Sequence, residues 1–203
     1  MKFTALIIGI DSWEKYTLPL IESIQQHDPD CQLVVLDNAS MTPYPRLSIV
    51  HHSDNRLCYA AAINRASYYV PAVDWLVILS NDVICTGQFT KTLEQITWDT
   101  VIGTKKMSVA GFDYLEGWCV ITPRIVFDDL NGWDENFKVS SWEDVDYSTR
   151  VLRRGYRLVE QTDLPFTHLD QRQRFSLPEF EGTHDSNRKY FEQKHYGNYL
   201  KLH

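Results

Sequence analysis

Short, uninterrupted apolar runs dominate the first 80 residues of the chain. Because their apolar positions are continuous rather than alternating, four runs predict buried strands: Phe3–Ile8, Gln32–Leu36, Leu47–Val50 and Trp75–Leu79. Apolar residues at helical spacing predict a helix over Tyr16–His27, and an Ala-rich segment without glycine or proline predicts another over Tyr59–Tyr69. This alternation of strands and helices indicates an α/β fold with a mostly parallel central sheet.

Polar residues follow three of the predicted strands at the point where each strand ends. They are Gly9–Ser12, Asp37–Asn38 and Ser80–Asp82. In open α/β sheets, ligands bind beyond the carboxyl ends of the strands. The sequence therefore predicts one ligand-binding crevice at this edge of the sheet.

After about residue 100 the pattern changes to shorter mixed segments. These include Trp118–Ile121, Arg157–Glu160 and a helix over about Ser186–Lys194. No Pro/Gly/Ser linker marks a boundary. We predict a single domain over 1–203, with a nucleotide-binding half over about 1–100 and an acceptor half over about 101–203.

Composition narrows the class of protein. The chain has 203 residues, of which 43% are hydrophobic and 23% charged, as in an ordinary globular protein. Its net charge of -7 argues against a nucleic-acid partner. The four cysteines form no Cys-x-x-Cys pair, which favours neither a zinc site nor a disulfide framework and fits a cytoplasmic setting. No apolar run approaches the ~20 residues of a transmembrane helix.

Three carboxylates, Glu143, Asp144 and Asp146, fall within one predicted helical turn. Ser140-x-x-Glu143 has the form of a capping box, and acids in the first turn interact favourably with the positive end of a helix. A structural role therefore accounts in part for the presence of Glu143. It does not require three acids in four residues, whose side chains, at ~100° per residue, cannot all point the same way.

The same helix has a predicted buried stripe of Val145, Thr149 and Leu152. This stripe would leave Asp144 projecting from the start of the helix toward the crevice. A carboxylate there could remove a proton from an acceptor hydroxyl that comes within ~3 Å.

Asp82 and His168 are candidate metal ligands. Mg²⁺ and Mn²⁺ prefer oxygen ligands and often complete their shell with phosphate and water, so one or two protein ligands can suffice. The alternative for Asp82 is a turn that ends the strand. His168 follows an apolar stretch and could equally be a core or a surface histidine. Arg172 and Arg174 could reach a diphosphate or be solvated surface charges.

Three tryptophans, Trp118, Trp133 and Trp142, border the same segments. Sugars have apolar C–H faces that stack on aromatic rings, but a tryptophan in a Gly-Trp-Asp loop is at least as often a core residue. We predict a core position for Trp133, and for Trp118 and Trp142 both roles remain open.

In combination and in order, these motifs resemble the family 2 glycosyltransferases, which have the GT-A fold. The matching segments are Leu33–Ser40, Tyr59–Ala66, Leu79–Val83, Gly117–Ile121, Gly132–Phe137, Glu143–Asp146 and Tyr190–Gly197. The resemblance implies a Rossmann-like nucleotide-diphospho-sugar transferase fold, with a Mn²⁺ or Mg²⁺ cofactor. It also implies a UDP- or dTDP-linked sugar donor, a glycan or glycoconjugate acceptor and a role in polysaccharide biosynthesis.

The resemblance assigns roles to individual residues. Asp144 corresponds to the catalytic base and Glu143 to a residue that helps to place the acceptor, while Asp82 and His168 correspond to the metal ligands. The remaining positions divide into two groups. Nucleotide-binding residues would be Ile10, Asp37, Asn38, Arg56, Ser80 and Asn81, and acceptor- or sugar-binding residues would be Gly117, Trp118 and Trp142.

Three departures from the family pattern concern the nucleotide side. Ile10–Ser12 replaces the usual Thr-Tyr-Asn, Cys58 behind Arg56–Leu57 replaces a glycine, and Ser80 replaces the first acid or amide of the metal motif. The chain is also short for a complete member, so it could be a minimal enzyme or one module of a longer polypeptide with further domains. An exposed edge strand in the second half could also serve a partner, as in a homo-oligomer.

Two alternatives compete with an enzyme of this family. One is a non-catalytic nucleotide-sugar-binding module of a larger glycosyltransferase, which would have no need of the acidic pair Glu143–Asp144. The other is a sugar nucleotidyltransferase, which needs a Gly-rich, basic loop after the first strand. Gly9–Trp13 has no such composition.

Overall fold

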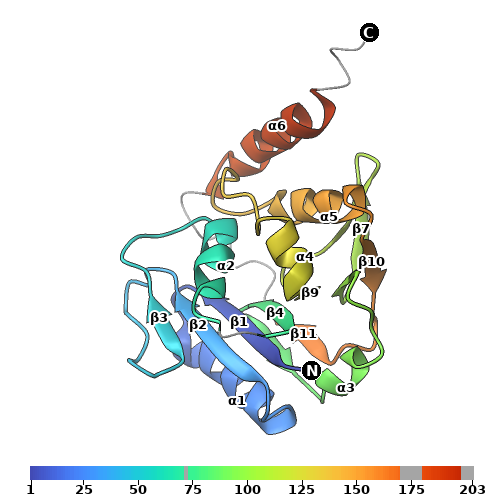
Figure 1. The fold of residues 1–203 in the computed structure, drawn as a ribbon. Coiled ribbons are helices and arrows are strands. Elements are labelled where there is room, and N and C mark those ends of the chain that lie inside the picture. Colours follow the sequence, from blue (N-terminus) through green and yellow to red (C-terminus); the bar gives the residue numbers. More distant parts are fainter. Residues whose placement is uncertain (71–72, 170–179, 198–203) are drawn as a thin grey trace.

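The computed structural model describes residues 1–70, 73–169 and 180–197, and Figure 1 shows how its elements are arranged. The strands are β1 (Phe3–Gly9), β2 (Gln32–Asp37), β3 (Val50–His52), β4 (Trp75–Ser80), β5 (Val83–Cys85), β6 (Thr100–Gly103), β7 (Lys106–Val109), β8 (Phe112–Leu115), β9 (Cys119–Pro123), β10 (Arg157–Glu160) and β11 (Phe166–His168). The helices are η1 (Trp13–Thr17, a π-helical turn), α1 (Leu18–His27), α2 (Tyr59–Ser67), α3 (Thr90–Leu93), α4 (Arg124–Asp129), α5 (Glu143–Arg153) and α6 (Thr183–Tyr196). No helix of the described part is long and apolar enough to cross a membrane.

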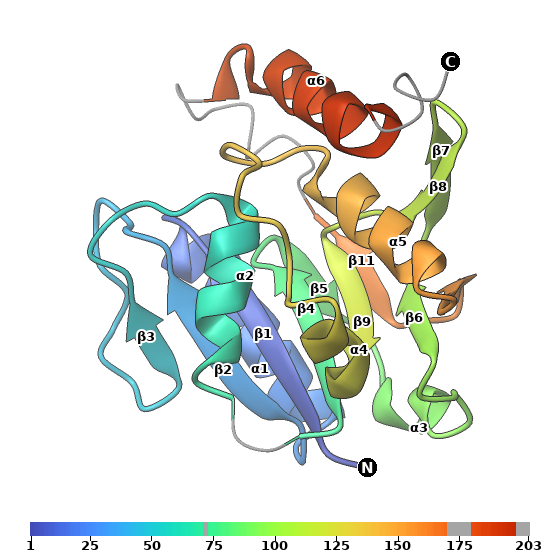
Figure 2. The same cartoon turned by 45° about the horizontal axis from the view of Figure 1, so that its top comes forward.

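The central sheet has the strand order β10-β6-β9-β4-β1-β2-β3 in the described part of the chain. β1 pairs in parallel with β2 and β4, β2 with β3 and β6 with β10, while β9 runs antiparallel to β4 and β6. Figure 2 shows α2, α4 and α5 in front of this sheet and α1 behind it. The predicted α/β fold with a mostly parallel sheet flanked by helices is confirmed.

The continuous apolar character of β1 follows from burial on both faces of the sheet. Ala5 and Ile7 pack in a cluster with residues of α1, whereas Leu6 and Ile8 pack in a second cluster with residues of α2, α4 and α5. Successive residues of a strand point to opposite faces, so both sets must be apolar. All seven residues of β1 are buried.

The third strand is shorter than predicted and begins later, at Val50 rather than at Leu47. Leu47 is half exposed and lies in a turn, in which its carbonyl accepts a hydrogen bond from the Val50 N–H. β3 is an edge strand whose register pairs Val50 with Val35. The turn at Leu47, and not the apolar character of the run, therefore sets the start of β3.

The capping box predicted at Ser140 is wrong. α5 begins at Glu143, after Ser141 and Trp142 with φ of 100° and 71°, and no side chain caps it. Ser140 therefore lies two residues before the observed N-cap, Trp142, and does not cap the helix N–H groups. The predicted buried stripe is right for Val145 and Thr149 but wrong for Leu152, which is 44% exposed; Val151 is buried in its place. Trp133 is buried, as predicted.

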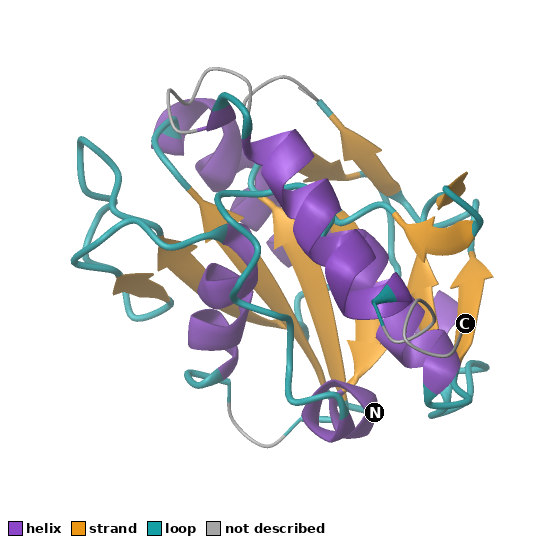
Figure 3. Cartoon of the chain, turned by 90° about the horizontal axis from the view of Figure 1, so that it is seen from above, coloured by secondary structure: helices purple, strands orange, loops and turns teal. Residues whose placement is uncertain are grey.

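Helix α6 lies across the top of the molecule, over α5, as Figure 3 shows from above. Its Phe191 is buried in a small cluster with Phe137, Trp142 and Val145. This cluster connects α6 to the loop that precedes α5 and to the first turn of that helix. Helix α6 therefore packs directly on the segment that contains the acidic motif.

Charged groups reinforce this contact around the buried carboxylate of Asp146. Oδ2 pairs with Nε of Arg150 at 2.7 Å, and Oδ1 lies 2.6 Å from Nζ of Lys194 and 2.7 Å from Nε2 of His195. Nδ1 of His195 lies 2.7 Å from Nη1 of Arg153. Because a guanidinium only donates, this arrangement requires a neutral His195 that donates from Nε2.

The pKa of Asp146 reflects two opposing effects. Burial raises it, but the hydrogen bond from His195 and the charges of Arg150 and Lys194 outweigh burial and hold the pKa below its usual value. A depressed pKa in the folded state stabilises the fold above the pKa of the unfolded state, ~4 for an aspartate. This contribution is lost as the pH falls below that value.

We expect Asp146→Ala to lower the free energy of unfolding by about 3–5 kcal/mol at pH 7, because it leaves two partly buried cations, Arg150 and Lys194, without their buried partner. The matched control is Asp128→Ala, which removes another Asp–Arg pair at the same spacing that is exposed (Asp128 side chain 55%) and contributes less than ~1 kcal/mol. Urea unfolding followed by circular dichroism at pH 7 and pH 3 measures both. Equal losses in the two variants would contradict a buried network.

Candidate functional site

A cleft of about 640 Å³ opens at the carboxyl edge of the central sheet. The register of β1 sets this edge, because Gly9 is opposite Asp37 of β2 and Ile8 is opposite Ser80 of β4. All the predicted site residues except Asp37 and Trp142 line the cleft. They are Ile10, Asn38, Arg56, Ser80, Asn81, Asp82, Gly117, Trp118, Glu143, Asp144 and His168.

Two asparagines of the predicted nucleotide side form the wall of the cleft. Asn38 makes a pair of hydrogen bonds with the backbone of Leu57, donating from Nδ2 to the carbonyl (2.9 Å) and accepting at Oδ1 from the N–H (2.8 Å). Asn81 donates from Nδ2 to the hydroxyls of Thr17 (3.1 Å) and Tyr44 (3.3 Å). Their amides are therefore used to join neighbouring loops, and they fix the shape of the pocket.

Asp37 does not reach the cleft. Its carboxylate accepts hydrogen bonds from the N–H groups of Ser40 (3.0 Å) and Tyr44 (2.9 Å) and contacts Nδ1 of His52 at 2.9 Å. Burial raises the pKa of Asp37, but these hydrogen bonds outweigh burial and hold it below its usual value. The Asp37 carboxylate thus holds the loop after β2 in place and does not line the cleft.

The side chains of Asp82 and His168 are in contact although the two residues are 86 positions apart in the chain. The antiparallel pair β5–β11 places His168 opposite Val83, and Nε2 of His168 lies 3.2 Å from Oδ2 of Asp82. The hydroxyl of Ser80 donates to Oδ1 of Asp82 at 2.7 Å and thereby orients that carboxylate. The indole of Trp118 stacks on the His168 ring, with centroids 4.8 Å apart.

This pair fits a divalent cation. Two ligand atoms at right angles, each ~2.1 Å from an octahedral ion, are ~3 Å apart, which is close to the separation of Oδ2 of Asp82 and Nε2 of His168. Without an ion, the two groups form an ion pair whenever His168 is protonated. Among the described residues no group of three His, Cys, Asp or Glu could hold a metal. Other ligands would come from a bound anion and water.

Asp144 lies on the opposite wall of the cleft, in the first turn of α5. Its Oδ2 accepts a hydrogen bond from the N–H of Gly117 at 3.2 Å, and its Oδ1 accepts one from the N–H of Val145 at 2.9 Å. A Cβ on Gly117 would lie 3.1 Å from Cβ of Asp144, so a glycine permits this close approach. Glu143 precedes Asp144 and is buried.

Tyr59, which sequence reasoning assigned only to the start of a helix, joins these two walls. Its hydroxyl donates to the Gly117 carbonyl (3.1 Å), and its N–H donates to the Val139 carbonyl (2.6 Å). Burial raises the pKa of Tyr59 well above its usual value, with the carboxylates Glu143, Asp82 and Asp144 adding to the effect. Tyr59 is therefore a neutral hydrogen-bond donor within the acidic cleft.

Asn187 of α6 is a second residue that sequence reasoning missed. It is buried, accepts a hydrogen bond from the Lys138 N–H (2.9 Å) and donates to the carbonyls of Lys138 (2.8 Å) and Ser141 (2.8 Å). One side chain thus fixes the loop that leads into α5. Trp142 belongs to the same junction: it is buried against Phe191, outside the cleft. No local pattern in the sequence indicates the role of Asn187, because its partners lie 46–49 positions away.

The segment with Arg172 and Arg174 lies outside the described residues. The other predicted positions are distributed over both walls of one cleft: the ends of β1, β2 and β4 form one wall, and the Gly117 turn and the start of α5 form the other. Such a site can bind an anion through a metal on one side and hold a carboxylate base on the other.

No family model and no curated protein sequence matches the chain. Solved structures do match. A mannosyltransferase from Pyrobaculum calidifontis, in complex with GDP-Man and Mn²⁺, has a TM-score of 0.67 and 16% identity over 85% of this chain and 58% of its own. GalNAc-T7 with UDP, GalNAc and Mn²⁺ has a TM-score of 0.66 and 9% identity, and 78% and 42% of the two chains are covered.

A third match is TarS of S. aureus in complex with UDP-GlcNAc, with a TM-score of 0.63 and 15% identity over 90% of this chain and 61% of its own. The match with the mannosyltransferase covers 58% of that chain and the match with GalNAc-T7 covers 42%, so this chain corresponds to only part of their length. The likeness shows the fold: the chain has the GT-A fold of glycosyltransferases, as the sequence predicted.

We expect Asn187→Ala to release the loop before α5, because four backbone groups of 138–141 lose a hydrogen-bond partner. Hydrogen–deuterium exchange of peptides that cover this loop should become faster. The control is Arg188→Ala, the next residue of α6, whose exposed side chain pairs with Glu192 of the same helix; it should leave the loop unchanged. Unchanged exchange in Asn187→Ala would show that packing alone holds the loop.

Proposed function

We propose that the chain is a metal-dependent inverting glycosyltransferase, which moves a sugar from a nucleoside diphosphate sugar to a hydroxyl of a glycan or glycoconjugate. The observation that supports this most strongly is the position of Asp82, His168 and Asp144 around one cleft. The GT-A fold adds support, since similar structures are complexes with GDP-Man, with UDP and with UDP-GlcNAc. UDP- and dTDP-sugars are the proposed donors, as in the family that the sequence resembles.

The donor would occupy the wall formed by the ends of the parallel strands. Ile10 and Arg56 line this part of the cleft, with Ser80 beside the metal pair. Asn38 and Asn81 maintain its shape through their bonds to neighbouring loops. Mn²⁺ or Mg²⁺ held by Asp82 and His168 would neutralise the negative charge that grows on the departing diphosphate.

Asp144 is the proposed general base. The acceptor oxygen forms a bond to the anomeric carbon from the face opposite the diphosphate, and its proton passes to the Asp144 carboxylate. The bond between the anomeric carbon and the diphosphate oxygen breaks, and the nucleoside diphosphate leaves with the electron pair. The configuration at the anomeric carbon is inverted, and no covalent intermediate with the protein is formed.

The surroundings of Asp144 suit this role. The N–H groups of Gly117 and Val145 hold its two oxygens in place. Orientation of the base in the bound complex lowers the entropic cost of reaching the transition state. Glu143 would orient the acceptor from the neighbouring position, and Trp118, which stacks on His168 with one face, would contact the transferred sugar with another part of its ring.

We expect Asp144→Asn to reduce transfer by about 10²–10⁴-fold while nucleotide binding is kept. The assay incubates the protein with radiolabelled UDP- and dTDP-sugars, Mn²⁺ and a panel of glycan acceptors. Asp113→Asn is the control, because this exposed acid lies on β8 and does not line the cleft. Wild-type rates from Asp144→Asn would refute its role as the base, and a product with retained anomeric configuration would refute inversion.

A second prediction concerns the metal. UDP or dTDP at ~100 times its dissociation constant should stabilise the protein by ~2.7 kcal/mol, and the shift in melting temperature should require Mn²⁺. In Asp82→Ala the metal-dependent part of the shift should disappear. A thermal-shift panel of UDP, dTDP, GDP, CMP and ATP, each with and without Mn²⁺, measures this. An unaltered shift in Asp82→Ala would exclude Asp82 as a ligand.

A further inference from the structure

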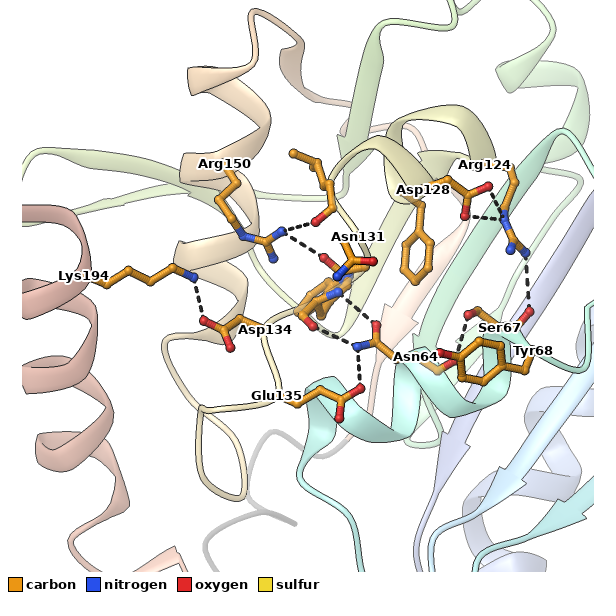
Figure 4. A pocket seen from close by; sticks show the side chains of 14 residues that line it. Asn64, Ser67, Tyr68, Arg124, Asp128, Asn131, Asp134, Glu135, Arg150 and Lys194 are labelled. Carbon is orange, nitrogen blue, oxygen red and sulfur yellow. Dashed lines mark hydrogen bonds and ion pairs between the residues drawn. The ribbon is translucent and has the colours of Figure 1, made fainter.

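A second pocket, of about 460 Å³, lies outside the cleft, and Figure 4 shows it from close by. It is formed by the end of α2, by α4, by the loop between α4 and α5, and by Lys194 of α6. Its volume is in the range of small-molecule sites in proteins. None of the proposed catalytic or nucleotide-binding residues lines it, so it needs a separate explanation.

The charges that line the pocket are balanced. Arg124 pairs with Asp128 (2.9 Å) and Lys194 with Asp134 (2.6 Å), as Figure 4 shows. Arg150 pairs with Asp146 beneath the wall and also donates from Nη1 to two backbone carbonyls. An anion would have to break one of these pairs and would also face the carboxylate of Glu135, which lines the pocket and accepts a hydrogen bond from Asn64. The lining therefore disfavours an anionic ligand.

The same wall has hydrogen-bonding groups to spare. Among the described residues, the side-chain amide of Asn131 and the hydroxyl of Tyr68 have no partner, and the ring of Tyr68 is 80% exposed at the rim. Nε1 of Trp133 and Nη2 of Arg150 are buried donors without an acceptor in the described part of the chain. Because these two atoms are buried, Asn131 and Tyr68 are the groups that a ligand can reach.

An exposed aromatic ring beside planar amide, carboxylate and guanidinium groups suits one class of neutral ligand in particular. A sugar has an apolar C–H face that can stack on an aromatic ring, and hydroxyls that donate and accept hydrogen bonds. A purely apolar ligand would leave the spare polar groups of Asn131 and Tyr68 unsatisfied.

The pocket adjoins the cleft through the loop after α4. Glu135 lines both cavities, and its Oε1 accepts a hydrogen bond from Nδ2 of Asn64 (2.8 Å), which also donates to the Trp133 carbonyl (2.8 Å). A ligand that consists of several linked units can therefore place one unit in the pocket and the next over this loop toward Asp144.

We propose that this pocket binds a neutral sugar unit of the acceptor glycan, one or more units away from the hydroxyl that reacts. The inference rests on the proposed function, because it identifies the occupant as part of the acceptor. It also defines the acceptor class as a neutral oligosaccharide rather than a single sugar or a charged polymer.

Two tryptophans allow the pocket and the cleft to be observed separately. Trp133 lines the pocket and Trp118 lines the cleft. In a ¹H–¹⁵N NMR spectrum of the whole chain, the six tryptophans each give one indole N–H signal, which can be assigned by side-chain correlation. Neutral disaccharides (maltose, cellobiose, chitobiose and mannobiose) and charged glucuronate are titrated without nucleotide, and UDP with Mg²⁺ is titrated separately.

We expect at least one neutral disaccharide to shift the Trp133 signal. Tyr68→Ala and Asn131→Gly should each weaken its binding about tenfold, the loss of one stacking or hydrogen-bonding contact. Asn131→Gly is chosen because residue 131 has a φ of 56°, which glycine tolerates. The control is Tyr69→Ala, an adjacent tyrosine that does not line the pocket and stacks on His51; it should leave the affinity unchanged.

Several results would overturn the proposal. They are a Trp133 signal that no disaccharide moves, a saccharide response confined to Trp118, a Trp133 response to glucuronate alone, and equal weakening in Tyr69→Ala. The UDP titration separates this from the proposed function. If a disaccharide moves Trp133 while UDP leaves Trp118 unchanged, the pocket is a sugar site and the transferase proposal fails; the reverse pattern leaves the transferase and removes the pocket.

Discussion

The pairing of β1 with both β2 and β4 is the constraint on which the rest of the structure depends. It buries β1 on both faces and both edges, so polar groups can reach solvent only where these strands end. Parallel register then brings the segments after Gly9, Asp37 and Ser80 to the same edge. The cleft follows from this geometry before any particular side chain is considered. Its opposite wall is supplied by the second half of the chain, through β9 and α5.

That second wall depends on a few long-range hydrogen bonds. The segment before α5 has positive φ at Val139, Ser141 and Trp142, which costs free energy for residues with side chains. Bonds from Asn187 and from the Tyr59 N–H hold it in this conformation. α6 therefore stabilises the loop before α5. It keeps the start of α5 in the position where Asp144 faces the strand ends.

The sequence predicted those features of the fold and the site that depend on contacts between residues close together in the chain. Burial on both faces of a strand is a local pattern, so the strands and their polar ends were predictable. Asp37 was placed at the correct strand end, but its carboxylate is used by the backbone seven residues on, and a motif does not show where a side chain bonds. The capping box at Ser140 failed because the strained loop after it displaces the helix start to Glu143. Tyr59 and Asn187 act on backbone groups 58 and 49 residues away, which no local pattern encodes.

The three neighbouring acids illustrate how burial divides residues that look alike in a sequence. Asp146 is fully buried, and the cations of α5 and α6 neutralise it. Asp144, two positions earlier, lines the cleft, and its two oxygens accept hydrogen bonds from the N–H groups of Gly117 and Val145. A base must have an oxygen that can accept a proton, and a carboxylate held between an arginine and a lysine is a poor one. The dense acidic motif is therefore best understood as one structural carboxylate that docks α6 and one exposed to the cleft. The first fixes the helix from which the second projects.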